Sequence, residues 1–137
     1  MKYYVIYLEG IDKTGKDTIC NYIVKLSNGK YVVNGRGLLT LIAYDKIFNR
    51  GFSYDFELQK YVLNVFLNVN KEDWEIRCKM TNEPVINYQE HMNAFEYAKN
   101  LIKPYTNLLE YNTSILTPYS IAKNIVLEMD KLNAKEK

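Results

Sequence analysis

Residues 3–18 read Tyr3-Tyr4-Val5-Ile6-Tyr7-Leu8-Glu9-Gly10-Ile11-Asp12-Lys13-Thr14-Gly15-Lys16-Asp17-Thr18 and combine a strand pattern, a glycine-containing loop and the start of a helix. It opens with β-branched and aromatic residues without polar alternation, which predicts a buried, central parallel strand over residues 2–8. Gly10 and the pair Gly15-Lys16 follow at the spacing of a phosphate-binding loop, whose glycines let backbone N–H groups point at a phosphate. A helical pattern over residues 16–27 then supplies a helix N-terminus, which favours an anion. We therefore expect a nucleoside triphosphate to bind here; the alternative is an ordinary glycine turn between a strand and a helix.

One position departs from the phosphate-loop pattern. Asp17 stands where Ser or Thr is the usual magnesium ligand, and Thr18 comes one residue late. A carboxylate is a hard oxygen ligand, so Asp17 is the predicted metal ligand, and ATP and Mg²⁺ are the predicted cofactors. Without a metal, the same carboxylate would repel the triphosphate. The residues expected to hold the triphosphate form one run: Gly10, Ile11, Asp12, Lys13, Thr14, Gly15, Lys16, Asp17 and Thr18.

The rest of the chain alternates strand and helix patterns. Further strands are predicted over residues 31–33, 61–69 and 108–111, and further helices over residues 38–48, 71–80, 89–102 and from Pro118, with a short helix at 56–60 capped by Asp55. Thr117 is the predicted N-cap of the last helix. Residues 81–88 are polar and contain Pro84, so a lid-like segment is expected at about 77–90. The pattern predicts one α/β domain over residues 1–137: a three-layer P-loop NTPase fold with helices on both faces of a mostly parallel sheet of about four strands.

Composition excludes several classes of function. The formal net charge of +2 is small and the lysines are scattered, which disfavours a polynucleotide partner. The sequence contains no apolar run of membrane length and no signal-peptide pattern, so we expect no membrane partner and a cytoplasmic protein with reduced thiols at Cys20 and Cys78. The sequence leaves a homodimer open.

Arginine is scarce in this chain. Of the 18 basic residues, only Arg36, Arg50 and Arg77 are arginines, and a guanidinium binds phosphate or carboxylate through two hydrogen bonds. Each is therefore a candidate site residue; the alternative is an ordinary surface charge. Arg36 follows the second predicted strand, and the carboxyl ends of parallel strands face the ligand crevice, so Arg36 is predicted to contact phosphate on the same rim as the loop.

Aromatic residues and the single histidine carry weaker signals. Tyr44 and Phe48 share a face of the helix predicted at 38–48, where they could either fill the core or stack on a base. His91 has no cysteine or second histidine nearby in the sequence, so it is predicted to lie on a solvent-facing side without a metal.

Residues 4–16 resemble the opening of thymidylate kinases, in which a strand is followed by Glu-Gly-Ile/Val-Asp, a small or basic residue, and Gly-Lys. A weaker likeness continues through Gly35-Arg36-Gly37, the strand over 65–69 with the helix that carries Arg77, and the turn at 113–118. The resemblance covers most of the chain, but only its first motif is specific. It implies a short deoxynucleoside monophosphate kinase of phage or viral type, acting in nucleotide biosynthesis in the host cytoplasm. The implied reaction transfers the γ-phosphoryl group of ATP to a thymidylate-like nucleoside monophosphate.

The resemblance also implies roles for single residues. Lys16 would hold the β- and γ-phosphates, and Lys13 would contact the transferred phosphoryl group. Arg77 would begin the lid, and Asn112 and Thr113 would lie near adenine. Together with Arg36, which would bind the acceptor phosphate, Lys13, Lys16 and Arg77 make up the implied catalytic set.

On the acceptor side, Asp12 resembles the aspartate that contacts the acceptor sugar, and Arg50 would assist Arg36. The segment between the first helix and the second strand is short, since only Asn28-Gly29-Lys30 separate them. The acceptor pocket is therefore expected to be reduced, or rebuilt from nearby aromatic residues such as Phe52, Tyr54 and Tyr88. The predicted acceptor-binding residues are Asp12, Arg36, Tyr44, Phe48, Arg50 and Tyr88.

Three functions remain in competition at this point. A monophosphate kinase needs no general base, because its acceptor is already a phosphate oxygen. A deoxynucleoside kinase would need a carboxylate base, and Glu9 is the acid best placed for it. A nucleotide-binding or partner-binding protein without turnover is the third reading, since Asp17 replaces the hydroxyl ligand and Gly35 replaces the acid that precedes Arg36 in the family.

Overall fold

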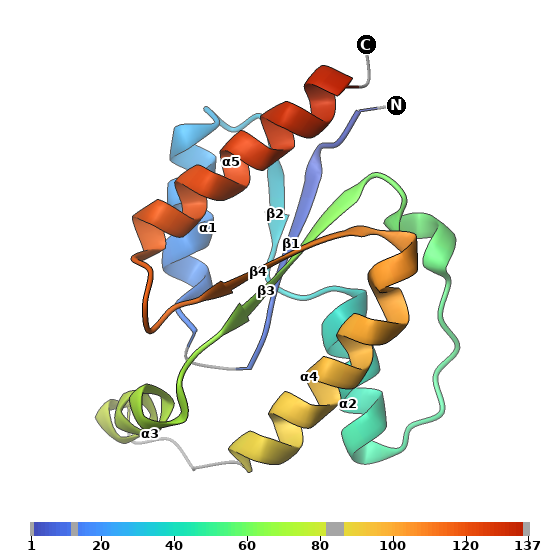
Figure 1. The fold of residues 1–137 in the computed structure, drawn as a ribbon, viewed down its shortest axis with the longest axis vertical. Coiled ribbons are helices and arrows are strands. Elements are labelled where there is room, and N and C mark those ends of the chain that lie inside the picture. Colours follow the sequence, from blue (N-terminus) through green and yellow to red (C-terminus); the bar gives the residue numbers. More distant parts are fainter. Residues whose placement is uncertain (1, 12–13, 82–86, 136–137) are drawn as a thin grey trace.

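The computed structural model describes residues 2–11, 14–81 and 87–135, apart from the side chain of residue 58. Its centre is a sheet of four parallel strands in the order β2-β1-β3-β4, with bounds β1 Val5–Glu9, β2 Val32–Asn34, β3 Val62–Asn68 and β4 Asn107–Asn112 (Figure 1). The five α-helices of the described chain are α1 Lys16–Leu26, α2 Leu38–Phe48, α3 Lys71–Met80, α4 Tyr88–Ile102 and α5 Pro118–Lys135. The predicted α/β class and the parallel sheet of about four strands are confirmed.

The two inner strands are the most apolar ones. Six of the seven residues of β3 are buried, and β1 lies between β2 and β3 with Leu8 opposite Val65 and Glu9 opposite Phe66. A strand covered on both faces needs apolar residues on both of them, and β3 follows this pattern except at Asn64 and Asn68. Since all four strands are parallel, their carboxyl ends lie along one edge of the sheet, where the loops after β1, β2, β3 and β4 meet.

Helices α1 and α5 cover one face of the sheet, together with a core of aliphatic side chains (Figure 1). Ile19 and Ile23 of α1 are fully buried there, because residues four positions apart share one side of a helix. Helix α5 begins as predicted: the backbone N–H of Ser120 donates to Thr117 Oγ1 at 3.2 Å, and Pro118 occupies the first turn.

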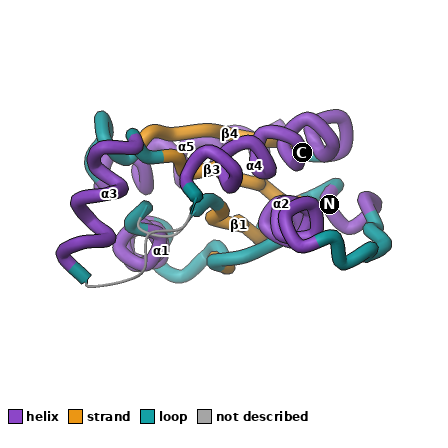
Figure 2. Tube along the Cα trace, turned by 90° about the horizontal axis from the view of Figure 1, so that it is seen from below, coloured by secondary structure: helices purple, strands orange, loops and turns teal. Residues whose placement is uncertain are grey.

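Helices α2, α3 and α4 contribute to the core on the other face. Phe66 of β3 contacts Phe95 of α4 edge to face, with ring centroids 5.3 Å apart, and Trp74 of α3 is 1% exposed. In Figure 2, which views the molecule from below, β1 lies between α1 and α2, the helices that follow the loops after β1 and β2. Helices therefore cover both faces of the sheet, as expected.

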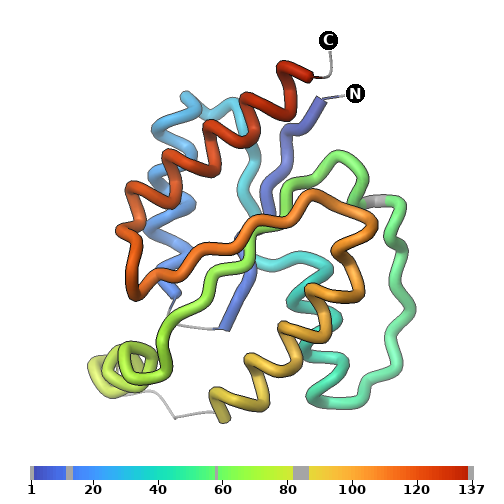
Figure 3. Tube along the Cα trace, viewed as in Figure 1, coloured from blue at the N-terminus to red at the C-terminus, as the bar shows by residue number. Residues whose placement is uncertain are grey.

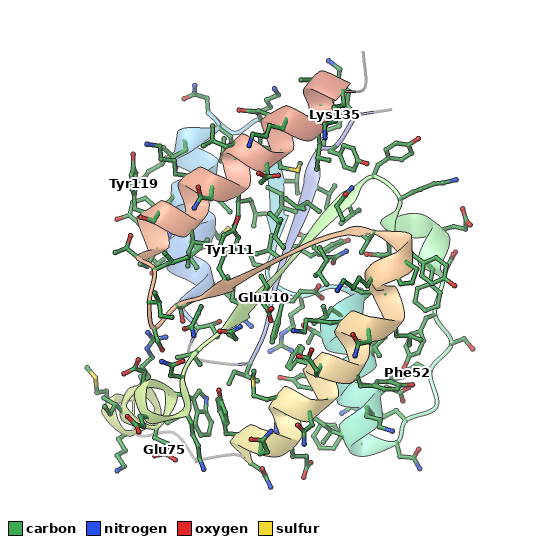
Figure 4. All side chains as sticks on the ribbon, viewed as in Figure 1. Phe52, Glu75, Glu110, Tyr111, Tyr119 and Lys135 are labelled. Atoms are coloured by element: carbon green, nitrogen blue, oxygen red, sulfur yellow. The ribbon has the colours of Figure 1, made fainter. Side chains whose placement is uncertain are left out.

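Helix α4 also covers the outer strand. Lys99 is 9% exposed, and its Nζ lies 2.6 Å from Oε1 of Glu110 on β4 and 2.8 Å from Oε2 of Glu96. Figure 4 shows Glu110 on the ribbon of β4. A lysine with two carboxylate partners can remain charged at low exposure, so this cluster attaches α4 to the edge of the sheet.

Some predicted boundaries differ from the structure. The first strand begins at Val5 instead of residue 2, and the short helix capped by Asp55 is a 3₁₀ turn, Phe56–Gln59. Tyr88, expected in a loop, is the first residue of α4 because Asn87 accepts from the N–H of Glu90 and caps the helix there. Of the expected lid-like segment, residues 82–86 lie outside the described residues. None of the described helices combines the length and the apolar character needed to cross a bilayer.

Candidate functional site

The loop after β1 has a backbone that only glycine fits at its first position. Gly10 has φ +146°, and a Cβ there would lie 2.2 Å from the carbonyl oxygen of Leu67 on β3. Gly10 therefore lets the chain turn away from the sheet in contact with β3. Thr14 is 2% exposed and its hydroxyl donates to the carbonyl of Ile11 at 3.2 Å, which ties the loop to itself. Gly15, at φ +81°, then leads into α1.

The lysine of the loop lies at the start of α1 and points back across it. Lys16 Nζ donates to the carbonyl oxygen of Gly10 at 3.2 Å, so the ammonium lies beside the turn that the loop makes. Asp17 and Thr18 are exposed in the first turn of α1. Asp12 and Lys13 lie outside the described residues.

The donor set of the loop fits a magnesium ion that arrives with a nucleotide. Mg²⁺ in nucleotide sites is commonly held by one or two protein oxygens, by phosphate oxygens and by water. Asp17 offers one such carboxylate, exposed and adjacent to Lys16. No three His, Cys, Asp or Glu side chains of residues 2–11, 14–81 and 87–135 form a metal site by themselves, so the described protein offers no ready-made cage.

Glu9, the last residue of β1, is buried at the N-terminus of α2. It is 0% exposed, and its Oε1 accepts the backbone N–H of Thr40 at 3.0 Å. Burial raises the pKa of Glu9 to about 7, although the N–H groups of Thr40, Gly37 and Leu39 and the charge of Lys16 all act to lower it. Among the described atoms, Oε2 has no hydrogen-bond partner. Glu9 thus joins the end of β1 to α2, the helix that follows β2.

The loop after β2 approaches β1 so closely that it needs a second glycine. A Cβ on Gly37 would lie 2.7 Å from the ring of Tyr7 and 3.0 Å from Oε1 of Glu9. Arg36, directly before it, is exposed at the carboxyl end of β2. Because β2 and β1 are paired in parallel, Arg36 and the loop after β1 follow neighbouring strands at the same edge of the sheet.

Arg77 of α3 joins two further segments at this edge. Its Nη1 donates to Oγ1 of Thr113 at 3.1 Å and its Nη2 to the carbonyl oxygen of Thr113 at 3.3 Å. The turn after β4 is fixed in the same region, since the Nδ2 of Asn112 donates to Oδ1 of Asn70 at 2.9 Å. Arg77 therefore holds α3 against the turn that begins at Thr113.

A pocket of about 340 Å³ lies where these segments meet. Its lining comes from the loop after β1, from α3 and from the turn before α5: Thr14, Gly15, Arg77, Met80, Thr81, Thr113 and Pro118. Figure 3 shows the start of α1 (blue), α3 (yellow-green) and the turn after β4 (orange-red) on the same side of the molecule. The structure thus brings four predicted site residues, Thr14, Gly15, Arg77 and Thr113, around one cavity.

The predicted acceptor residues are more dispersed. Arg50 follows the C-terminal end of α2, whereas Arg36 precedes its N-terminal end, and an eleven-residue helix spans about 16 Å. The structure therefore does not bring Arg50 to Arg36, and Arg50 instead lies 5.0 Å from the ring centroid of Phe48. The length of α2 thus separates Arg50 from the Arg36 that it is predicted to assist.

The aromatic residues of the predicted acceptor set pack against protein groups. Tyr44 contacts the rings of Phe48, His91 and Phe95 edge to face, at centroid distances of 6.0 to 6.2 Å. The hydroxyl of Tyr88 donates to the carbonyl oxygen of Val69 at 2.6 Å. Tyr44 therefore fits the core-packing interpretation, and His91, expected to face solvent alone, lies half-buried against Tyr44.

Sequence reasoning missed residues whose roles depend on contacts across the chain. Met80, Thr81 and Pro118 line the 340 Å³ pocket, although none of them was among the predicted site residues. The one available signal was that Met80 lies three residues after Arg77 on the same helix, which places both on one side of it. A larger cavity of about 590 Å³ lies between the C-terminal half of α2 and the N-terminal half of α4, lined by residues that include Lys46, Glu90 and Asn93.

Comparison with known proteins supports the fold. No protein-family model and no curated protein matches the sequence. Among solved structures, the chain is similar to the YorR protein from Bacillus subtilis, whose crystal structure was obtained in complex with phosphorylated GDP. The two chains share 15% sequence identity with a TM-score of 0.69, and the match covers 92% of this chain and 95% of YorR. At this identity the likeness establishes a shared fold, that of a YorR-like α/β domain.

Proposed function

We propose that this protein binds a nucleoside triphosphate, ATP in the first instance, and transfers its γ-phosphoryl group to a deoxynucleoside monophosphate of the thymidylate type. The observation that carries the proposal is the convergence of the glycine-turned loop, Arg77 and Thr113 on one pocket of about 340 Å³. A loop whose amides and lysine meet at a helix N-terminus suits a phosphate chain, and the pocket beyond Gly15 offers room for the rest of the nucleotide.

The proposed roles follow from charge and position. Lys16 holds the terminal phosphates, Arg36 on the neighbouring strand end binds the acceptor phosphate, and Asp17 completes the shell of a magnesium ion carried by the triphosphate. The ion supplies charge neutralisation on the phosphoryl group. Phosphoryl transfer between two phosphates needs alignment and positive charge and no general base. Lys16, Arg36 and the magnesium ion are groups of the type that this reaction requires. Lys13 and Asp12 keep their proposed roles on the transferred group and the acceptor sugar, respectively.

The similar structure supports the class of ligand. YorR was crystallised in complex with phosphorylated GDP, and its fold matches this chain over nearly its whole length. A guanine nucleotide on that fold supports a nucleotide as the ligand of this one. The choice of monophosphate acceptor rests on the thymidylate kinase likeness of residues 4–16 and on Arg36.

A deoxynucleoside kinase is the second candidate, and one observation favours it. A 5′-hydroxyl acceptor needs a general base, and burial brings the pKa of Glu9 to about 7, where such a base works best. Glu9 is however hydrogen-bonded to the start of α2 and is 0% exposed, which leaves it out of direct reach of a substrate. We therefore rank this function second. Binding without turnover is the third candidate, because of Asp17 and Gly35.

A phosphoryl-transfer assay distinguishes these functions. The purified protein is incubated with ATP, Mg²⁺ and each of the four deoxynucleoside monophosphates and, separately, each of the four deoxynucleosides. A diphosphate product supports the first function, and a monophosphate product formed only from nucleosides supports the second. ATP binding without formation of any product would support the third candidate, a nucleotide-binding protein without turnover. Lys16→Ala should abolish ATP binding, while Lys25→Ala, an exposed lysine on the same helix, should leave it intact. Full binding by the Lys16 variant would refute the assignment of the loop.

A further inference from the structure

Glu9 links β1 to the helix that follows Arg36, although it is buried out of direct reach of a substrate. We infer, building on the proposed function, that Glu9 is a positioning residue for the acceptor: it caps helix α2 from the neighbouring strand and so holds Arg36 in place to bind the acceptor phosphate. Glu9 acts through Arg36 and makes no contact with the nucleotide itself.

Helix α2 begins without the local side chains that usually cap a helix. An N-cap Ser, Thr, Asp or Asn normally accepts an N–H of the first turn through its side-chain oxygen. The N-cap of α2 is Gly37, and the first turn contains no acidic residue. A side chain at position 37 would collide with its neighbours, because a Cβ there would lie 2.7 Å from the ring of Tyr7 and 3.0 Å from Oε1 of Glu9. Helix α2 therefore takes its capping acceptor from another part of the chain.

The carboxyl group of Glu9 supplies that acceptor. Its Oε1 accepts the N–H of Thr40 at 3.0 Å, and Thr40 is the third residue of α2, the position that an N-cap side chain commonly serves. Glu9 is 0% exposed and Thr40 is 4% exposed, so the loss of this contact would leave a buried N–H without an acceptor, which is costly. A protonated carboxyl keeps an oxygen that accepts, so the contact does not depend on ionisation.

The backbone that carries Arg36 is attached to β1 at both of its ends. On one side, Asn34 at the end of β2 pairs with Tyr7 of β1. On the other side, Glu9 at the end of β1 holds the N–H of Thr40. Arg36 lies between these two attachments, two residues after the first and four before the second. Glu9 therefore fixes the direction in which the chain leaves Arg36.

Side-chain packing contributes little to the position of Arg36. Arg36 is exposed, and at Gly35, directly before it, a Cβ would meet no atom within 4 Å. Without Glu9, the strand pairing at the end of β2 would be the remaining attachment of this segment to β1. The loss of a helix cap changes an equilibrium constant by about 2- to 30-fold, and we expect the affinity for the acceptor to fall within this range.

Steady-state kinetics of the full chain test the inference, with ATP, Mg²⁺ and the deoxynucleoside monophosphate that the wild type phosphorylates fastest. Glu9→Ala removes the capping oxygen and should raise KM for the monophosphate by about 3- to 30-fold, with the Kd for ATP within about twofold of the wild type. Glu9→Gln keeps an oxygen that accepts from Thr40 and should restore KM to within about twofold. Partial unfolding would instead lower the apparent kcat at an unchanged KM, because it reduces only the amount of active enzyme.

Two further variants distinguish positioning from a general loss of stability. Arg36→Ala removes the group through which Glu9 acts, so the addition of Glu9→Ala to it should change KM by less than about twofold. Asn133→Ala is the matched control, since Asn133 is 8% exposed and its Oδ1 accepts the N–H of Tyr3 at 2.7 Å, just before the opposite end of β1. This variant also leaves a buried N–H without its acceptor, and it should destabilise the protein without a change in KM.

The outcomes separate this inference from the function on which it rests. A raised KM for Glu9→Ala that Glu9→Gln restores, and that disappears in the Arg36→Ala background, supports it. An unchanged KM for Glu9→Ala, an equal rise for Glu9→Gln, or a full effect without Arg36 overturns it and leaves the proposed function standing. If Glu9→Ala does not fold, Glu9→Asp takes its place with the same expected direction, because its carboxyl group lies one methylene farther from α2. If the wild type forms no product from any monophosphate, the proposed function falls, and this inference falls with it.

Discussion

Glu9→Gln should remove a pH dependence of folding that the buried carboxyl creates. The pKa of Glu9 in the folded protein is about 7, raised by burial from the ordinary 4.5. In the unfolded chain the carboxyl loses its proton near pH 4.5, whereas in the folded chain it keeps it until about pH 7. Folding therefore binds a proton between these values, and stability falls as the pH rises through this window. The full difference corresponds to about 3 kcal/mol.

Urea denaturation at pH 5 and pH 8 measures the effect. Between these two values the carboxyl of Glu9 should contribute a loss of about 2 to 3 kcal/mol in the free energy of unfolding of the wild type. Glu9→Gln keeps an oxygen that can accept from the N–H of Thr40 but does not titrate, so its free energy of unfolding should change by that much less between the two pH values. Other titrating groups affect both proteins alike and cancel in the comparison.

The control uses a carboxyl in a comparable place with a different degree of burial. The side chain of Glu72, like that of Glu9, lies at the N-terminus of a helix, in this case the first turn of α3, but it is exposed. Glu72→Gln should therefore follow the pH dependence of the wild type. Equal pH dependence of the wild type and Glu9→Gln would refute the reasoning, because it would mean that burial does not favour the protonated form of Glu9. The absolute stability of Glu9→Gln is a weaker readout, since its amide must also find an acceptor.

Three further substitutions test the site from other directions. Gly10→Ala should lower the melting temperature severely or prevent folding, because its Cβ would lie 2.2 Å from the carbonyl oxygen of Leu67, whereas Gly29→Ala, with open space around it, should cost only about 1 to 3 kcal/mol in thermal unfolding. Arg36→Ala should keep the fold and raise KM for the monophosphate by about 10- to 100-fold in steady-state kinetics, with the Kd for ATP unchanged. Arg77→Met removes both hydrogen bonds to Thr113 and should weaken ATP binding in a titration by about 10-fold or more; unchanged binding would contradict its role.

Residue patterns within short windows of the sequence predicted most of the helices and strands. The helix expected over residues 38–48 has those bounds in the structure, and the strand expected over 61–69 is β3, Val62–Asn68. Helical spacing of apolar residues and unbroken apolar runs are properties of short windows, which is why the sequence suffices for them. The N-cap at Thr117 is equally local, since it depends on a hydroxyl and the backbone three residues later.

The parts of the site that the sequence did not predict are contacts between distant segments. Arg77 and Thr113 are 36 positions apart, and Glu9 and Thr40 are 31 apart, so no periodicity links them. The separation of Arg36 and Arg50 could be read from the sequence itself, because a helix of eleven residues between them must separate its ends. Arg36, at a strand end, can therefore lie at the carboxyl edge of the sheet, whereas Arg50 is carried away from it by the helix between them.

The two glycines that flank Arg36 differ in whether packing requires them, and one of them, Gly35, is a departure from the thymidylate kinase pattern. At Gly35, a Cβ would meet no atom within 4 Å and the backbone is not in the left-handed region, so the fold would accommodate an acidic residue there. Gly37, two residues later, has no such freedom, because a side chain would enter the ring of Tyr7. Packing therefore requires glycine at 37 and not at 35, so packing does not explain why the acid is missing at position 35. With no carboxylate at position 35, Asp17 becomes the predicted protein ligand on which magnesium binding, and with it phosphoryl transfer, would depend.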